Sequence, residues 1–255
     1  MKPAVVTALA LSLAFAESSA AKADQQESAI GQQVYAQMQQ SAAIVARPNP
    51  LYDVLDPIAA RIKRYADPQY DYPFAFVIVH DAGPNAFAVP GGVVYVTDAL
   101  FHFVQNKEEF ASILCHETAH DIDHDLMHTV AKDQQMATLI GLIGAFSGFV
   151  KSARGRYAEN LAYAMQTNSY ALDVENIADR RGAATCAEAG YNPWGMIWLF
   201  QNFAKNDSGA AMEALSDPES QIHRIANLQT YFEELPQLFG PFSSNGATAT
   251  ALLPS

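Results

Sequence analysis

The sequence has little positive charge, few cysteines and no long apolar run, and each shortage excludes a class of protein. Its 255 residues include 15 lysines and arginines against 27 aspartates and glutamates, so the formal net charge is −12. This acidity argues against nucleic acid as a partner and against binding anionic lipid by charge. Two apolar stretches, residues 4–16 and 134–150, fall short of the ~20 residues that span a membrane. We therefore expect no transmembrane span, with peripheral membrane contact through residues 134–150 as the minor alternative.

The N-terminus has the layout of a secretory signal peptide. Lys2 precedes the apolar run, and small residues follow, with Ala21-Lys22-Ala23 before Asp24 as a cleavage site. No cysteine lies near this point, so a lipoprotein anchor is not expected. We expect a signal peptide at residues 1–23, a mature domain at 24–240 and a loose tail at 241–255. The mature protein should then be periplasmic or secreted.

One motif carries chemistry, and it lies in an apolar run that predicts a helix from about residue 107. Residues 116–120 read His-Glu-Thr-Ala-His, and no proline or glycine interrupts them. On a helix His116 and His120 project side by side, which makes half of a tetrahedral zinc site. Glu117 lies about 100° further round the helix, where it can take a proton from a zinc-activated water.

A second helix downstream offers the third ligand. Glu175 and Asp179 are four residues apart and share one helix face. Glu175 would complete a site for one zinc ion per chain, and Asp179 would accept the ring N–H of a ligand histidine. The alternative is that both acids pair with arginines of the same helix.

The remaining histidines and the cysteines each allow two interpretations. His124 and His128 continue the four-residue spacing, and we prefer a solvated helix face over a second metal site. Cys115 and Cys186 could form a disulfide in an oxidising compartment. However, Cys186 lies ~16 Å along the helix from Glu175. We therefore expect two buried free cysteines.

The rest of the chain predicts helices packed around a few short strands. Apolar residues recur at helical spacing in residues 24–47 and 51–65, and further helices are expected from residues 194 and 218. Strands are expected at 74–79, 86–89 and 93–96. Pro90-Gly91-Gly92 fits either a plain hairpin turn or an exposed sheet edge that could bind an extended peptide.

Several segments together resemble the zinc metallopeptidase family that includes the CAAX prenyl protease, HtpX-like membrane enzymes and BepA-type periplasmic proteins. The resemblance rests on Glu27-x-x-Ile30-Gly31, the run from Asn85 to Thr97, His116 to His120, Glu175-x-x-Ala178-Asp179, Ala189 to Pro193, and Arg224-Ile225. It implies an α+β fold: a mostly helical gluzincin with a small sheet whose edge lines the active-site cleft. Three positions depart from the family. His124-Asp125 replaces an Arg-His pair, Ala171-Leu172 replaces a Ser-Arg pair that often precedes the third ligand, and Asp217-Pro218 replaces a His-Pro that can approach the metal.

These observations predict a zinc endopeptidase with His116, His120 and Glu175 on the metal and Glu117 as base. Arg224 is a weaker candidate for stabilising the oxyanion, and Asp217 for gating the site. The resemblance implies unfolded envelope proteins as substrates and a role in protein quality control. The alternatives are a periplasmic chaperone or assembly factor with a gated or weakly active site, and another metal-dependent hydrolase.

Overall fold

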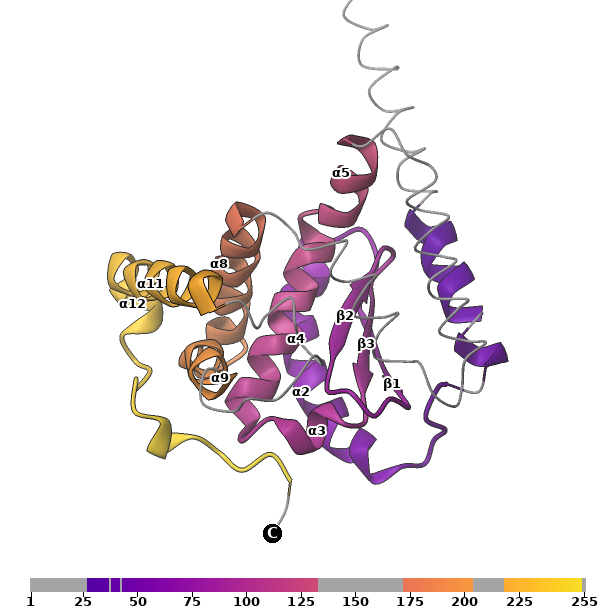
Figure 1. Ribbon diagram of the computed structural model, residues 1–255, viewed down its shortest axis with the longest axis horizontal. Helices are drawn as coiled ribbons and strands as arrows, with labels where there is room; N and C mark the ends of the chain where they lie inside the picture. Colours follow the sequence, from indigo (N-terminus) through magenta and orange to yellow (C-terminus); the bar gives the residue numbers. More distant parts are fainter. Residues whose placement is uncertain (1–26, 37, 42, 133–171, 204–217, 254–255) are drawn as a thin grey trace, which may run out of the picture.

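The structure is a computed structural model that describes residues 27–253 except 37, 42, 133–171 and 204–217 (Figure 1). The predicted signal peptide, the apolar stretch 134–150 and Asp217 lie outside the described residues. Within the described part, no helix is both long and apolar enough to cross a membrane.

Helices dominate the described chain. Residues 27–36 and 38–40 are helical. The named helices follow in chain order: α2 (Pro50–Ala66), α3 (Leu100–Phe103), α4 (Lys107–Ile122), α5 (Asp125–Lys132), α8 (Leu172–Glu188), α9 (Trp194–Phe203), α11 (Pro218–Glu234) and α12 (Pro236–Phe239), with 3-10 turns at Asp67–Gln69 and Gly246–Thr248. The predicted mostly helical α+β fold is confirmed.

The three expected strands form one small mixed sheet. Strands β1 (Ala75–Val79), β2 (Ala86–Val89) and β3 (Val93–Thr97) lie in the order β1-β3-β2. β1 runs parallel to β3, and β2 runs antiparallel to it. Gly91 and Gly92 have φ values of 97° and 86°, which glycine adopts without a steric penalty. Pro90-Gly91-Gly92 is therefore a hairpin turn, and it leaves β2 at the edge of the sheet.

Side chains alternate between the two faces of the sheet, as the pleat requires. Val94 and Val96 of β3 face the main core with α2 and α4, whereas Tyr95 faces a smaller cluster. That cluster contains Val34 and Met38 of the N-terminal helical segment. Helices thus cover both faces of the sheet.

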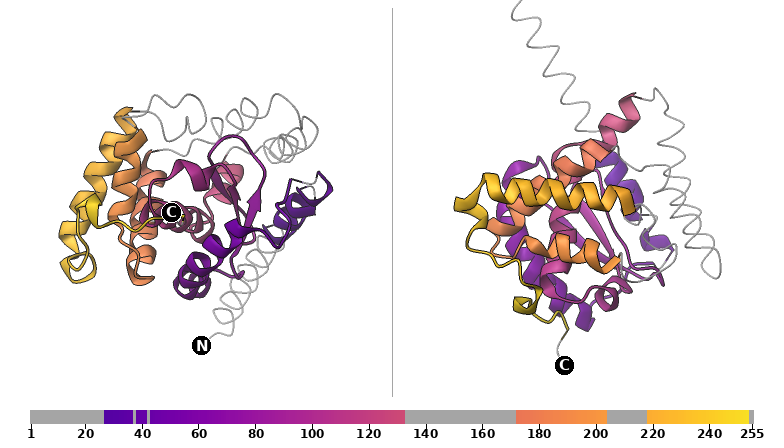
Figure 2. Two further views of the ribbon diagram at one scale, coloured as in Figure 1. Left: turned by 90° about the horizontal axis from the view of Figure 1, so that it is seen from below. Right: turned by 60° about the vertical axis from the view of Figure 1, so that its left-hand side comes forward.

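Helix α4 lies at the centre of the molecule, between the sheet and the helices α8 and α9 (Figure 1). Fourteen of its sixteen residues are buried, polar ones included, so the helix is enclosed on all sides rather than on one face. Asn106 caps its first turn by accepting a hydrogen bond from the Glu109 N–H at 2.8 Å. Figure 2 shows α11 lying across α8 on the side away from the sheet.

The C-terminal residues are attached to the domain, so the expectation of a loose tail is wrong for the described residues 241–253. The Lys107 N–H donates to the Thr250 carbonyl, and the Thr250 N–H donates to the Glu108 carboxylate, both at 2.8 Å. The Trp198 indole donates to the Ser244 carbonyl, and Leu252 is buried in the core. Backbone hydrogen bonds hold much of this segment, and a composition of small and polar residues does not reveal them. The domain boundaries at residues 24 and 240 stay predictions.

Candidate metal centre

Helix α4 places the two histidines of the motif side by side, as expected. Their ring centroids are 4.6 Å apart, and their Nε2 atoms are 3.0 Å apart. Both side chains are buried: His116 is 5% exposed and His120 is 7% exposed. Two imidazole nitrogens therefore point at one small volume between α4 and α8.

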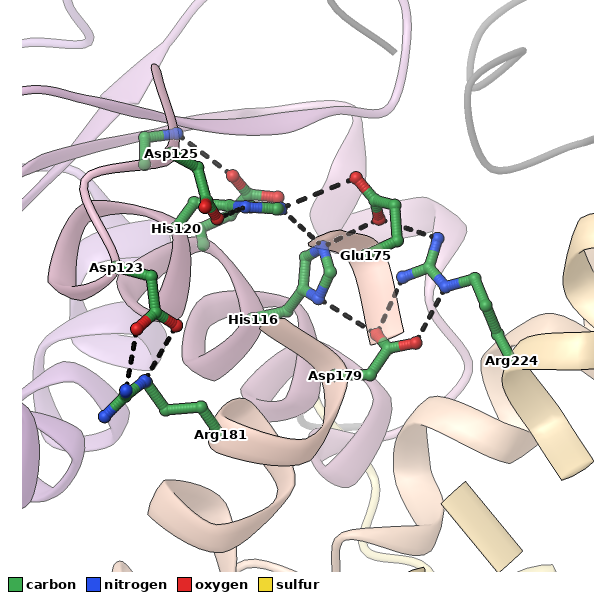
Figure 3. A network of polar contacts seen from close by, with 10 residues as sticks. His116, His120, Asp123, Asp125, Glu175, Asp179, Arg181 and Arg224 are labelled. Carbon is green, nitrogen blue, oxygen red and sulfur yellow. Dashed lines mark hydrogen bonds and ion pairs between the residues drawn. The ribbon is translucent and has the colours of Figure 1, made fainter. Parts of the chain in front are cut away.

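Glu175 of α8 faces the same volume, although it lies 59 residues beyond His116 in the sequence. Its carboxylate oxygens are 3.5 Å from His116 Nε2 and 3.7 Å from His120 Nε2 (Figure 3). Among the described residues, these three side chains are the group whose ligand atoms converge closely enough to hold a metal ion.

The donor set fits zinc in both chemistry and spacing. Two imidazoles and one carboxylate are the ligands of many catalytic zinc sites. With zinc–ligand bonds of about 2.0–2.1 Å, neighbouring ligand atoms of a tetrahedron lie about 3.4 Å apart. The three observed separations of 3.0, 3.5 and 3.7 Å bracket that value.

Two features bring α4 and α8 together at this point. A Cβ on Gly182 would lie 3.0 Å from the His116 backbone, so the helices meet through a residue with no side chain. One turn further along α8, Cys186 forms a disulfide with Cys115, with their Cα atoms 5.9 Å apart. The prediction of two free cysteines is therefore wrong. The helices are in contact at Gly182, and the long side chains of His116 and Glu175 span the rest of the distance.

Asp179 lies behind one of the two candidate ligand histidines, and that histidine is His116. Asp179 Oδ1 lies 3.0 Å from His116 Nδ1, so Nε2 of the same ring is left to face the metal position. Asp179 is 2% exposed. The structure therefore places this predicted site residue directly behind His116, a candidate metal ligand.

Arg224 of α11 lies behind both carboxylates (Figure 3). Its Nε and Nη2 atoms donate to the two oxygens of Asp179 at 2.7 Å each, and its Nη1 is 2.9 Å from Glu175 Oε2. The side chain is almost fully buried. This fork of charge-assisted bonds favours a role in orienting Glu175 and Asp179 over the predicted role at the oxyanion.

Electrostatics make the centre attractive to a cation. Burial on its own would lower the pKa of His116, but hydrogen bonds and charges from Asp179 and Glu175 raise it to about 10. Burial on its own would raise the pKa of Glu175, but the hydrogen bond with His116 and the charge of Arg224 lower it to about 2. Burial would likewise raise the pKa of Asp179, but the charge of Arg224 lowers it. Both carboxylates therefore stay ionised at neutral pH, and they draw positive charge to the imidazoles.

The Glu117 side chain extends from α4 toward the edge strand β2. Burial raises its pKa, while the nearby histidines oppose the shift. One carboxylate oxygen accepts a hydrogen bond from the Ala88 N–H of β2 at 3.0 Å. The candidate base is thus fixed in orientation by the sheet edge.

The later histidines do not continue the stripe of His116 and His120. Helix α4 ends at Ile122 and α5 begins at Asp125, with His124 between them at a φ of 53°. His124 is paired with Glu27 at 2.6 Å, and His128 is exposed. Neither belongs to a metal-binding cluster within the described residues. The His124 side chain is 39% exposed, so it is partly solvated as expected, but it lies at a helix break and its ring is paired with Glu27.

Comparison with known proteins places the chain among peptidases. Residues 46–232 match the family described as peptidase family M48. The beta-barrel assembly-enhancing protease of Yersinia pestis is 31% identical over 185 residues, covering 70% of this chain and 38% of that protein. Its Escherichia coli K12 counterpart is 27% identical over 177 residues, covering 67% and 36%. The mitochondrial metalloendopeptidase OMA1 of Schizosaccharomyces pombe is 23% identical over 159 residues, covering 62% and 46%. The chain thus spans less than half the length of each of these relatives.

Proposed function

Because the chain belongs to peptidase family M48, we propose that it is a zinc-dependent endopeptidase. The observation that carries this proposal is the convergence of His116, His120 and Glu175 on one volume. Glu117 follows His116 directly on α4. These are the groups that peptide hydrolysis requires, namely three metal ligands and a base. The sequence offers the pattern, and the geometry supports it.

Glu117, Asp179 and Arg224 have separate roles in the proposed reaction. A zinc ion in this centre would supply an acidified water and polarise the scissile carbonyl. Glu117 takes the proton of the attacking water and later delivers it to the leaving amine. Its raised pKa suits that exchange, because a base works best when its pKa approaches the working pH. Asp179 and Arg224 hold the ligands in place throughout.

The edge strand offers a surface for the substrate backbone. Among the described residues, β2 pairs with β3 on one side, and on its other side the Ala88 N–H donates to Glu117 of α4. An extended peptide can add to such an edge through main-chain hydrogen bonds. Only a segment free of its own secondary structure can do this. Unfolded or poorly assembled proteins are therefore the proposed substrates.

The proposed setting is the periplasm, with quality control of envelope proteins as the role. The predicted signal peptide at residues 1–23 supports export, and the Cys115–Cys186 disulfide is typical of an oxidising compartment. The two bacterial relatives are named for enhancing the assembly of beta-barrels. We further propose that Asp217 contributes to gating, as its place in the family pattern suggests.

The test is cleavage of casein, an unfolded protein, by the full chain beside Glu117→Gln from the same preparation. The proposal expects cleavage by the first, none by the second, and loss of cleavage when a chelator is added. Negligible cleavage by both, with zinc still bound, would refute the peptidase and favour the alternative of a chaperone or assembly factor. Hydrolysis of esters or amides without peptide cleavage would favour another hydrolase.

A further inference from the structure

Both histidines of the metal centre have a carboxylate on their second ring nitrogen, and the two carboxylates come from different elements. Asp179 of α8 lies behind His116, as the helix spacing predicts. Behind His120 lies Asp125, the first residue of α5, with Oδ2 at 2.8 Å from Nδ1 (Figure 3). The Asp125 side chain is 12% exposed, so water screens this contact only weakly.

The contact depends on a break in the helix. In a continuous helix, residue 125 would lie about 140° around the axis from residue 120 and would face another direction. Here α4 ends at Ile122. His124 then adopts a φ of 53°, a left-handed conformation that residues other than glycine rarely take. The chain turns at His124, and this turn brings the Asp125 carboxylate to Nδ1 of His120.

Other residues hold the break in place. His124 Nδ1 is 2.6 Å from Glu27 Oε1, and Glu27 is 4% exposed. The second oxygen of Glu27 accepts the Tyr70 hydroxyl at 2.7 Å, and the Tyr70 ring lies 5.5 Å from the His124 ring. The N-terminal helical segment therefore supports the conformation that brings Asp125 to His120. Uncommon backbone conformations that neighbours hold in this way cluster at functional sites.

We propose that Asp125 is a positioning residue for the metal centre. It accepts the Nδ1–H of His120, which fixes the tautomer with Nε2 facing the metal and sets the plane of the ring. This inference rests on the proposed zinc function. The family resemblance places a histidine at this position, so the carboxylate is a feature of this chain.

The test is zinc affinity of the full chain, measured by competition with a chelator of known affinity. Asp125→Ala should weaken zinc binding about 10- to 100-fold, the usual effect of losing a carboxylate behind a ligand histidine. The matched control is Asp123→Ala, which removes the same charge two residues away. Asp123 pairs with Arg181 rather than with a ligand, so its loss should leave the affinity close to wild type.

Two further measurements separate positioning from folding. Asp125→Asn keeps the shape and an acceptor oxygen while losing the charge, so it should show a smaller loss of zinc affinity. Visible absorption of the cobalt-substituted chain should change in Asp125→Ala and not in Asp123→Ala, because the bands report ligand orientation. Zinc affinities of both Asp125 variants equal to that of Asp123→Ala would overturn the inference alone. Failure of the wild-type chain to bind zinc would overturn the proposed function as well.

Discussion

Replacing Arg224 with methionine should destabilise the protein far more than replacing an arginine at the surface. Arg224 makes three short charged contacts, two to Asp179 and one to Glu175, and its own side chain is only 2% exposed. Arg224→Met keeps most of the apolar stem but leaves the buried Asp179 and the partly buried Glu175 without their cation. Removing one partner of a buried ion pair costs about 3–5 kcal/mol. His116 stays beside both acids and offsets part of the loss, so we expect the lower end of that range.

The assay is urea unfolding of the protein prepared without metal, compared with Arg180→Met. Arg180 lies on α8, bonds Asn227 and approaches Glu234 only to 3.9 Å, with 36% of its side chain exposed. Its loss should cost about 1 kcal/mol, because exposed pairs contribute little. Equal stability losses for the two variants would refute the buried network. A stable Arg224→Met that binds zinc normally and fails only in turnover would restore the oxyanion role.

Three further predictions concern stability around the metal centre. The Cys115–Cys186 disulfide spans 71 residues, so reducing or replacing it should lower the free energy of unfolding by about 4 kcal/mol. Urea unfolding with and without reductant measures this loss, and an unchanged free energy would mean that the bond does not form. Gly182→Ala places a Cβ against the His116 backbone, so overpacking should lower the free energy of unfolding by about 1–3 kcal/mol in the same urea assay. An unchanged free energy would mean that α4 and α8 lie further apart. In the protein without metal, the stabilising contribution of Glu175 is present above its ordinary pKa of 4.5 and is lost as pH falls toward its lowered pKa of about 2. The contribution of His116 is present below its ordinary pKa of 6.5 and is lost as pH rises through its raised pKa of about 10. The unfolding midpoint should therefore be highest at about pH 4.5–6.5. A maximum above pH 8 would contradict the raised pKa of His116, and stability that does not fall between pH 4.5 and 2 would contradict the lowered pKa of Glu175.

The convergence of the centre was predictable from the sequence because its parts are local. Four-residue spacings place His116 beside His120, and Glu175 on the same face as Asp179, in any regular helix. The three strands follow from equally local patterns, whereas the sequence left open whether Pro90-Gly91-Gly92 is a hairpin turn or marks an exposed edge. The family resemblance is confirmed, and it agrees with the pairing of the two helices that the two motifs together indicated.

The features that prediction missed depend on how distant segments meet. The disulfide follows from the contact between α4 and α8 at Gly182, and distance along a single helix could not reveal it. Asp125 reaches His120 only because His124 interrupts the helix, held there by Glu27 from 97 residues away. Helical periodicity predicts the opposite for both. A left-handed residue is hard to foresee when it is not glycine.

The most direct test of the account is the zinc content of the purified full chain, determined by elemental analysis beside Glu117→Gln and Glu175→Ala. Glu175 is the informative position, because its place in the centre depends on the fold and not on the histidine motif. We predict one zinc per chain in the wild type and in Glu117→Gln, and a strong loss of zinc in Glu175→Ala with the fold retained. Full zinc occupancy in Glu175→Ala, or none in the wild type, would contradict the metal centre described here.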